Sequence, residues 1–435
     1  MGAFREKKSF IYLHKKLGRL FRIFGPGLVT GASDDDPSGI TTYAQAGAKF
    51  GYGQLWIMIF TYPLLTAVQE ACARIGVVTG KGLASVIRGE YSKKILFFIV
   101  ALTAIANIIN IGADMGAMGA VVQMLLPVSF VLIILVFTAI VLILEIFLPY
   151  AKYVKILKWL TLALLSYPLT LILIKAPWKE LLKATFVPHF ELSFGFIFII
   201  VGVLGTTISP YLFFWQASEE VEEEIENKIT SIDGKPQLNK QFIENFRADN
   251  AIGMFISQFT AWSIIAVTAT VLYKNGITEI TSAADAAKAL EPLVQGFSSA
   301  GFLAKTIFAL GIVGTGLLAV PILSGSAAYA ISEVFGWKEG LSRKINEARG
   351  FYGVIIIATV IGLIINLTGI NPIKALIFTA VINGIVSIPL LYLINRIASN
   401  EKIMGQYKSG FLSKILLWIT FVIMAVAAVA MFITL

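Results

Sequence analysis

Long apolar segments separated by short charged stretches are the main pattern of this chain. An α-helix rises about 1.5 Å per residue, so roughly 20 apolar residues cross the hydrocarbon core of a bilayer. Gly and Pro interrupt the first and the eighth of these segments, so these two match the pattern of a transmembrane helix least well. The pattern predicts an all-α integral membrane protein with about eleven transmembrane helices, near residues 21–47, 54–78, 95–125, 127–148, 153–175, 193–216, 248–272, 301–331, 351–370, 373–395 and 412–434.

The composition supports a membrane protein and excludes a soluble one. Of the 435 residues, 57% are hydrophobic and 14% are charged, whereas soluble domains carry about 25% charged residues. The net charge of +9 would suit nucleic acid, but the basic residues sit between apolar segments, as they do in membrane proteins. We therefore expect a lipid bilayer and no nucleic acid as a partner. The single cysteine, Cys72, cannot form an intrachain disulfide and is expected to be buried.

The Lys and Arg residues predict an orientation. Residues 1–20 show no signal-peptide pattern and are predicted to be a cytoplasmic N-terminal tail, because cytoplasmic loops are rich in Lys and Arg. Counting spans from this tail puts most basic loops on the same side, although Lys175, Lys179 and Lys183 fall outside. The odd span number predicts a multi-pass protein of the cell membrane with an external C-terminus. The basic residues assigned to the cytoplasm are Arg5, Lys7, Lys8, Lys15, Lys16, Arg19, Arg22, Lys81, Arg88, Lys93, Lys94, Lys152, Lys155, Lys338, Arg343, Lys344, Arg349, Arg396, Lys402 and Lys408.

The longest hydrophilic stretch, residues 217–247, is rich in glutamate. It is too short to fold as a soluble domain alone. It is either a solvated loop or helix extension, or a cytoplasmic vestibule that attracts cations, and the sequence leaves both interpretations open. The glutamates at its start are Glu219, Glu220, Glu222, Glu223, Glu224 and Glu226.

Three consecutive carboxylates, Asp34, Asp35 and Asp36, lie inside the first apolar segment and are followed at once by Pro37. Proline lacks a backbone N–H and its ring clashes with the preceding turn, so the helix should break here and free backbone carbonyls. A charge at membrane depth costs at least about 3 kcal/mol. These carboxylates therefore indicate a partner, a water-filled cavity or a bound cation. The alternative is an aqueous loop between two shorter elements.

The sixth segment is interrupted in the same way, by small residues and Pro210. Interrupted helices at matched positions in two halves of a chain are typical of inverted-repeat transporters, whose binding site lies at the bilayer midplane. Unwound carbonyls together with carboxylates would form an oxygen-rich site for a hard cation. We expect a first repeat at residues 21–175 (spans one to five), a second at 193–395 (spans six to ten) and an extra eleventh span at 412–434.

The residues around these breaks resemble the Nramp family of divalent-metal transporters. The likeness covers most of the first three spans, the sixth and the tenth. It implies the fold shared with LeuT-type transporters, which has two inverted repeats of five helices and one extra helix. The residues that carry the resemblance are Phe24–Gly27 (FGPG), Asp36-Pro37, Thr42–Tyr52 (TYAQAGAKFGY), Arg74–Lys81 (RIGVVTGK), Asp114 and Asn371–Leu376 (NPIKAL).

Departures from the family's pattern change the expected ion. The first-span motif Asp-Pro-Gly-Asn has Gly39 in place of Asn, and the sixth-span motif Met-Pro-His has Ser209 in place of Met. The Met thioether is a soft ligand, so its loss leaves hard oxygen donors. The family's Ala upstream of Met corresponds to Thr206, and a Gln of the tenth span corresponds to Ala380. Losing bulky ligands makes room for water, which Mg²⁺ sheds reluctantly.

The groups that the family uses for proton transport are missing as well. Its two sixth-span histidines correspond to Tyr211 and Gln216, and the Glu one turn after Asp114 corresponds to Ala117. Histidine is the usual side chain that titrates near neutral pH, and the two histidines of this chain lie outside the predicted spans. The pattern resembles the Nramp-related magnesium transporter branch. That resemblance implies transport of Mg²⁺, and also Mn²⁺, without proton coupling.

The resemblance implies metal ligands at both breaks. Asp36 is the expected carboxylate ligand, and Gly39 and Thr206 are expected to offer free carbonyls. Ser209 and Tyr211 are expected to be outer-shell groups. The ion is a substrate in this interpretation, so we expect no cofactor and no obligatory protein partner.

Other acidic residues extend the candidate ion path. Asp34 and Asp35 are expected either to add charge to the cavity or to face an external funnel. Asp114 on the third span is either an ion-path residue or a satisfied polar residue packed between helices.

Five further residues have structural interpretations. Glu70 and Arg74, four residues apart on a helix, are expected to form an ion pair. Glu145 lies near a cytoplasmic helix end and is expected at the membrane interface. Asp249 and Asn250 near the start of the seventh span are expected to be helix caps.

Three competing functions differ from uncoupled Mg²⁺ and Mn²⁺ transport. A proton-coupled importer of Mn²⁺ or Fe²⁺ would have the same fold with a degenerate site. A Na⁺-coupled amino-acid transporter of this fold would bind a substrate carboxylate at the breaks, where Asp36 and its neighbours should repel it. An integral-membrane enzyme is disfavoured, because the sequence shows no clustered His and no paired catalytic groups.

Overall fold

The computed structural model describes residues 26–148, 162–226 and 240–435. Every regular element in these residues is a helix, which confirms the predicted all-α class. The predicted tail at 1–20, the start of the first span, Lys152 and Lys155, the first part of the fifth span and residues 227–239 of the acidic stretch lie outside the described part.

Each predicted span has a helix at its place. The first span is divided into α2 and α3, the sixth into α11 and α12, and α9 is the described end of the fifth. The bounds are α2 (Pro26–Asp34), α3 (Pro37–Phe50), α4 (Trp56–Thr79), α6 (Lys93–Leu125), α7 (Phe130–Phe147), α9 (Ser166–Leu173), α11 (Phe194–Thr207), α12 (Pro210–Glu226), α13 (Lys240–Val271), α15 (Ala300–Phe335), α16 (Arg349–Asn366), α17 (Pro372–Ala398) and α19 (Phe411–Ile433). Shorter helices are η1 (Gly51–Gln54), α5 (Leu83–Glu90), η2 (Leu162–Leu165), α10 (Trp178–Phe186), η3 (Tyr273–Asn275), α14 (Ala283–Ala287), η4 (Lys288–Val294), α18 (Glu401–Met404) and η5 (Gly405–Tyr407).

Length and hydropathy agree with a bundle that crosses a membrane. In the described residues, eight helices are long and apolar enough to span a bilayer, with residues 194–225 counted as one. A further pair, α3 with η1 and then α4, passes the same test only together and is bent by 107°. The bend arises because the chain turns back after α3 to begin the second span.

The eighth predicted span is a helix at its expected place, although Gly and Pro interrupt its sequence. Residues 300–335 form one continuous helix, α15, with Pro321 inside it. Side chains supply hydrogen bonds to carbonyls near this proline. Asn107 of α6 donates to the Leu323 carbonyl at 3.1 Å, and Ser324 reaches the Pro321 carbonyl at 3.0 Å. The carbonyl that the proline itself leaves without a helical N–H is that of Leu317, and packing among neighbouring helices allows such a proline inside a transmembrane helix.

The broken helices pack backbone to backbone against their neighbours. A Cβ added to Gly31 of α2 would overlap the backbone of Gly253 on α13, and one added to Gly205 of α11 would overlap the Ala380 carbonyl and Gly384 of α17. Small residues allow such close approach of membrane helices. The two breaks are therefore held from either side by long helices, which fixes their position in the bundle.

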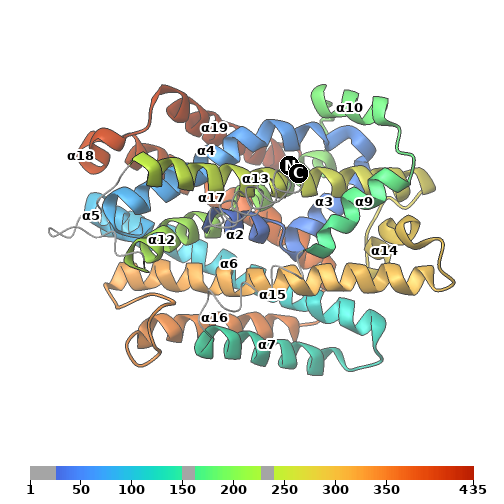
Figure 1. Cartoon of the computed structure of the whole chain (residues 1–435), viewed down its shortest axis with the longest axis horizontal. Coiled ribbons are helices and arrows are strands. Elements are labelled where there is room, and N and C mark those ends of the chain that lie inside the picture. The colour runs from blue at the N-terminus through green and yellow to red at the C-terminus, as the bar shows by residue number, and fades with distance from the viewer. Residues whose placement is uncertain (1–25, 149–161, 227–239) are drawn as a thin grey trace, which may run out of the picture.

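The two ends of the bundle carry different short helices. Helices α5, α12 and α18 lie at one end, and α10 and α14 lie at the other (Figure 1). At the first end, Arg88 of α5 donates to the Glu333 carbonyl near the end of α15, at 2.8 Å. We call this the α5 end and the opposite one the α14 end. The α5 end is the one that the Lys and Arg pattern assigns to the cytoplasm.

Candidate metal centre

The first break lies where the sequence predicted it. Helix α2 ends at Asp34 and α3 begins at Pro37, which needs no N–H partner at the first helical position. Asp36 caps α3: its Oδ1 accepts a hydrogen bond from the Gly39 N–H at 2.6 Å. The carboxylate is thus fixed at the N-terminus of a helix, with its second oxygen directed elsewhere.

The second break is held by a serine hydroxyl. Helix α11 ends at Thr207 and α12 begins at Pro210. Between them, the Ser209 Oγ lies 2.6 Å from the carbonyl oxygens of both Gly205 and Thr206. A hydroxyl has one hydrogen, so it can donate to only one of these carbonyls at a time, and the oxygen keeps its lone pairs.

Tyrosine hydroxyls join the two breaks. Tyr211, just after the second break, donates from its Oη to the Ser33 carbonyl at the end of α2, at 3.0 Å. Tyr43 of α3 has its Oη 3.0 Å from Thr206 Oγ1 and 3.2 Å from Thr207 Oγ1. The predicted residues Thr206, Ser209 and Tyr211 therefore lie beside the predicted carboxylates, although the two groups are about 170 positions apart in the chain.

Asn110 of α6 links Asp36 to Asp114. Its Nδ2 donates to Asp36 Oδ2 at 3.1 Å and to Asp114 Oδ2 at 3.0 Å. The side-chain amide oxygen of Asn110, Oδ1, in turn accepts a hydrogen bond from Asn383 Nδ2 of α17 at 3.1 Å. One amide with two N–H bonds thus holds both carboxylates in place. Asp114 lies at the centre and not merely between scaffold helices.

The other two carboxylates of the first break face α13. Ser257 donates to Asp34 Oδ2 at 2.6 Å and lies 3.5 Å from Asp35 Oδ1. Both aspartates are at most 2% exposed. They therefore add charge to the buried centre and do not face an external funnel in this structure.

The centre concentrates negative charge without a cationic partner. Asp34, Asp35, Asp36 and Asp114 are all buried, and among the described residues none of them pairs with Lys or Arg. The Oδ1 atoms of Asp34 and Asp114 accept no hydrogen bond. Buried charges of one sign are costly unless a counter-charge or protons neutralise them. The arrangement therefore suits a bound cation.

Direct ligation by several carboxylates at once is not part of this geometry. No three His, Cys, Asp or Glu side chains of the described chain are arranged to hold one metal ion. An ion at Asp36 would need carbonyl, hydroxyl or water oxygens for its remaining ligands. Mg²⁺ typically binds in this way, with one or two carboxylates and retained water.

Gly39 does not offer the free carbonyl that the sequence led us to expect. It lies in the first turn of α3, where a carbonyl accepts the N–H four residues later, and its own N–H is bound by Asp36. The break falls one turn earlier, because Pro37 starts the new helix. The carbonyls next to the break on this side belong to the end of α2, where Ser33 already accepts from Tyr211.

Three polar residues of the centre were missed or undervalued in the sequence. Asn110, Asn383 and Ser257 were not among the predicted site residues. Each is a buried polar residue in a long, largely apolar helix that carries other polar residues as well. A polar residue in such a helix is often functional, and that signal could have identified all three.

Glu145 does not lie at the membrane interface, as its place near a helix end suggested. It is buried between α7 and α15 and hydrogen-bonded to Ser324. Asp249 and Asn250 are not caps of their own helix either, because α13 begins at Lys240. Asp249 instead accepts a hydrogen bond from the Gly27 N–H of α2 at 2.7 Å. The expected ion pair of Glu70 and Arg74 is confirmed, at 3.0 Å.

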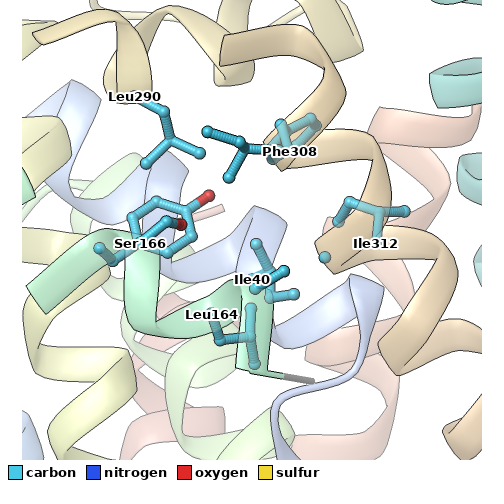
Figure 2. Close-up of a pocket in the computed structure, with 10 residues that line it drawn as sticks. Ile40, Leu164, Ser166, Leu290, Phe308 and Ile312 are labelled. Carbon is cyan, nitrogen blue, oxygen red and sulfur yellow. The ribbon is translucent and has the colours of Figure 1, made fainter. Parts of the chain in front are cut away.

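An apolar pocket lies beside the centre toward the α14 end. It is lined by α3, η2, α9, η4 and α15 and has no space for a water molecule. Figure 2 shows Ile40, Leu164, Leu290 and Phe308 around it, with the Ser166 side chain among them. Ile40 is one helical turn after Asp36, to whose carbonyl its N–H donates. The apolar lining makes this pocket unsuitable for a metal ion.

Comparison with known proteins agrees with this geometry. The family model described as "Natural resistance-associated macrophage protein-like" (Nramp) matches residues 27–434. A "Divalent metal cation transporter MntH" of Caldanaerobacter subterraneus is 25% identical over 94% of this chain and 92% of its own length. The protein of that name from Klebsiella pneumoniae is 28% identical over 68% of each chain.

Solved structures show the same fold. The Eremococcus coleocola manganese transporter superimposes with a TM-score of 0.72 over 95% of this chain and 87% of its own, at 17% identity. Mhp1, a nucleobase-cation-symport-1 family transporter, follows with a TM-score of 0.56 over 95% and 90%, at 14% identity. At these identities the likeness concerns the fold alone. The family model, in contrast, covers nearly the whole sequence, and the chain therefore belongs to the Nramp family.

Proposed function

We propose that this protein carries hard divalent cations, Mg²⁺ and also Mn²⁺, across a cell membrane without moving protons. As an Nramp protein it is a multi-pass membrane transporter of divalent metal cations and not an enzyme. The choice of ion and the lack of proton coupling depend on the residues of the centre.

One observation carries the proposal: Asp36 stands at a helix break with a buried carboxylate that no cationic side chain in the described chain neutralises. Its Oδ1 is fixed by the α3 N-terminus and its Oδ2 by Asn110. A helix N-terminus and an amide donor keep the carboxylate oriented without cancelling its charge. The negative charge of the Asp36 carboxylate can therefore still attract a cation.

The neighbouring donors support a hard cation. Thr206 and Ser209 at the second break present oxygen atoms. Hard oxygen ligands favour Mg²⁺ and Mn²⁺ over softer metals, whereas a thioether at the same place would favour the softer ones. The relatives named as manganese transporters make Mn²⁺ the natural second substrate to test.

The fold supports alternating access around this centre. We assign residues 21–175 and 193–395 to the two repeats, with residues 412–434 as the extra helix, and we place the α5 end in the cytoplasm. In inverted-repeat transporters, one repeat or bundle rocks against the other around a fixed midplane site. Here the centre is buried from both ends, which suits an intermediate between the outward-open and inward-open states.

Ion uptake by proteoliposomes tests the proposal. We expect purified protein to take up Mg²⁺ and Mn²⁺, with protein-free liposomes as the control. Uptake restricted to Mn²⁺ or Fe²⁺ and accompanied by protons would favour a proton-coupled transition-metal importer. Na⁺-driven uptake from an amino-acid mixture, with no metal uptake, would favour an amino-acid transporter of the same fold.

Ser209→Met is expected to change selectivity. It places a thioether at the second break, and soft ligands raise the affinity for Cd²⁺ and Mn²⁺ relative to Mg²⁺. A gain of about 1.4 kcal/mol for the soft ion would shift the Cd²⁺ to Mg²⁺ uptake ratio about tenfold. Ser209→Ala, which removes the hydroxyl without adding sulfur, is the control. An unchanged ratio in Ser209→Met would mean that this side chain does not face the ion.

A further inference from the structure

A line of polar side chains runs along α12 from the centre toward the α5 end. Gln216, Glu220 and Glu224 are spaced four residues apart, so they lie on one face of the helix. Thr30 of α2 donates to Gln216 Oε1 at 2.5 Å, and Gln216 Nε2 donates to Glu220 Oε1 at 2.8 Å. Thr30 is one helical turn from Asp34, so the line begins directly beside the metal centre.

The two glutamates in this line are buried and only partly satisfied. Glu220 and Glu224 are each 1% exposed. Glu220 Oε2 and Glu224 Oε1 accept no hydrogen bond. An unpaired buried carboxylate oxygen costs several kcal/mol in an apolar environment. Two of them on one helix face indicate a place where a cation is bound during part of the transport cycle.

The neighbouring glutamates have a different role. Glu222 accepts hydrogen bonds from the Tyr329 hydroxyl and from the Leu341 and Ser342 N–H groups. Glu333 accepts from the Ser85 N–H at 2.6 Å and from Ser218. Glu222 thus binds the backbone of the segment after α15, and Glu333 binds the backbone near the start of α5. Glu222 and Glu333 therefore have structural partners for their carboxylates, whereas Glu220 Oε2 and Glu224 Oε1 accept no hydrogen bond from the described residues.

Additional negative charge faces the same place. The carboxylates of Glu223 on α12 and Asp249 on α13 lie within electrostatic range of Glu220. Asp249 itself binds the N-terminus of α2. A cation that leaves Asp36 past α2 would therefore meet a negative potential along α12 and not an apolar wall.

We propose that Glu220 and Glu224 form a second, transient site for the transported divalent cation, between the Asp36 centre and the α5 end. The inference rests on the proposed function, since it concerns the exit of the same ion. The described residues hold no cluster of three acidic side chains suited to tight metal binding. Two carboxylates and retained waters would bind the ion weakly, as a site of passage requires.

Counting bound Mn²⁺ tests this second site. Titration of the purified full-length protein, with free Mn²⁺ read by electron paramagnetic resonance, should give about two ions per chain. Glu220→Gln with Glu224→Gln should bind one ion, at the affinity of the tighter wild-type site. Glu90→Gln with Glu347→Gln removes two exposed glutamates from the same end and should still bind two. Glu220→Asp with Glu224→Asp, which keeps both carboxylates, should restore the second ion.

The transport assay adds an independent readout. The Glu220→Gln, Glu224→Gln variant should keep its KM within about threefold and lose about tenfold in maximal rate, because the ion still enters but leaves slowly. If the double variant does not fold, the single variants Glu220→Gln and Glu224→Gln are measured in its place. Retention of two bound ions and of full rate in the folded variant would overturn the second site. The same titration of Asp36→Asn tests the proposed function separately, since there the tighter ion should be lost.

Discussion

Asp36→Ala is expected to abolish divalent-cation binding and transport. The substitution removes the one carboxylate that the N-terminus of α3 and Asn110 both orient. Loss of a partner that merely orients a metal ligand typically costs 10- to 100-fold in affinity, so loss of the ligand itself should cost at least about a hundredfold. Calorimetric titration with Mg²⁺ and Mn²⁺ on purified protein measures the effect.

Asp36→Asn separates the two roles of this side chain. Asp36 also caps α3, and replacing a cap by alanine costs about 0.5–2 kcal/mol of stability. Asparagine caps a helix as well as aspartate does but carries no charge. We expect Asp36→Asn to unfold at the wild-type temperature and still to bind no metal. Wild-type affinity for Mg²⁺ in Asp36→Asn would refute the assignment of the site.

Metal uptake is expected to leave the internal pH of proteoliposomes unchanged. Coupled transport needs a group that takes up and releases a proton in step with ion occupancy. Tyr211 and Gln216 occupy the two positions where the family carries histidine, and Tyr titrates near pH 10 while Gln does not titrate. Ala117 removes the carboxylate that would accompany Asp114. The structure gives Tyr211 and Gln216 fixed partners, Ser33 and Glu220, in hydrogen bonds that need no proton exchange.

The driving force is then the ion gradient and the membrane potential. A potential of 100 mV is worth about 2.3 kcal/mol per charge, so an interior-negative membrane drives divalent import without protons. The measurement uses a pH-sensitive dye inside the liposomes, with the potential clamped by potassium and valinomycin. Acidification in fixed ratio to metal uptake would contradict uncoupled transport. In that case Asp36→Asn and Asp114→Asn would identify which carboxylate carries the proton.

The breaks could be predicted from sequence because their causes are local. Pro37 and Pro210 lack an N–H, and each follows small or acidic residues within an apolar run. The helix boundaries follow from those two facts alone. The error at Gly39 has a local cause as well: the residue after a break was taken to be unwound, whereas proline at the first position starts a regular helix.

Partners far apart in the sequence were not predictable in this way. Asp249 lies 222 residues from Gly27, and Glu145 lies 179 residues from Ser324. Nothing in the local sequence of α13 shows that Asp249 accepts a hydrogen bond from the N-terminus of α2. Asn383 was missed because the comparison with the family drew attention to Ala380, one turn earlier on the same helix. The partner of a polar residue buried between long helices depends on how the whole bundle packs, and the local sequence does not show it.

The hydrogen bond from Gly27 to Asp249 has a consequence for the speed of the transport cycle. Any movement of α2 away from α13 during the cycle requires this bond to be exchanged for one to water. A hydrogen bond to a charged group contributes about 1.5–3 kcal/mol, which changes the ratio of closed to open molecules by a factor of roughly 10 to 150. Neither residue needs to touch the ion. Sequence changes at this contact can therefore adapt turnover to a warmer or colder membrane while the choice of ion stays the same.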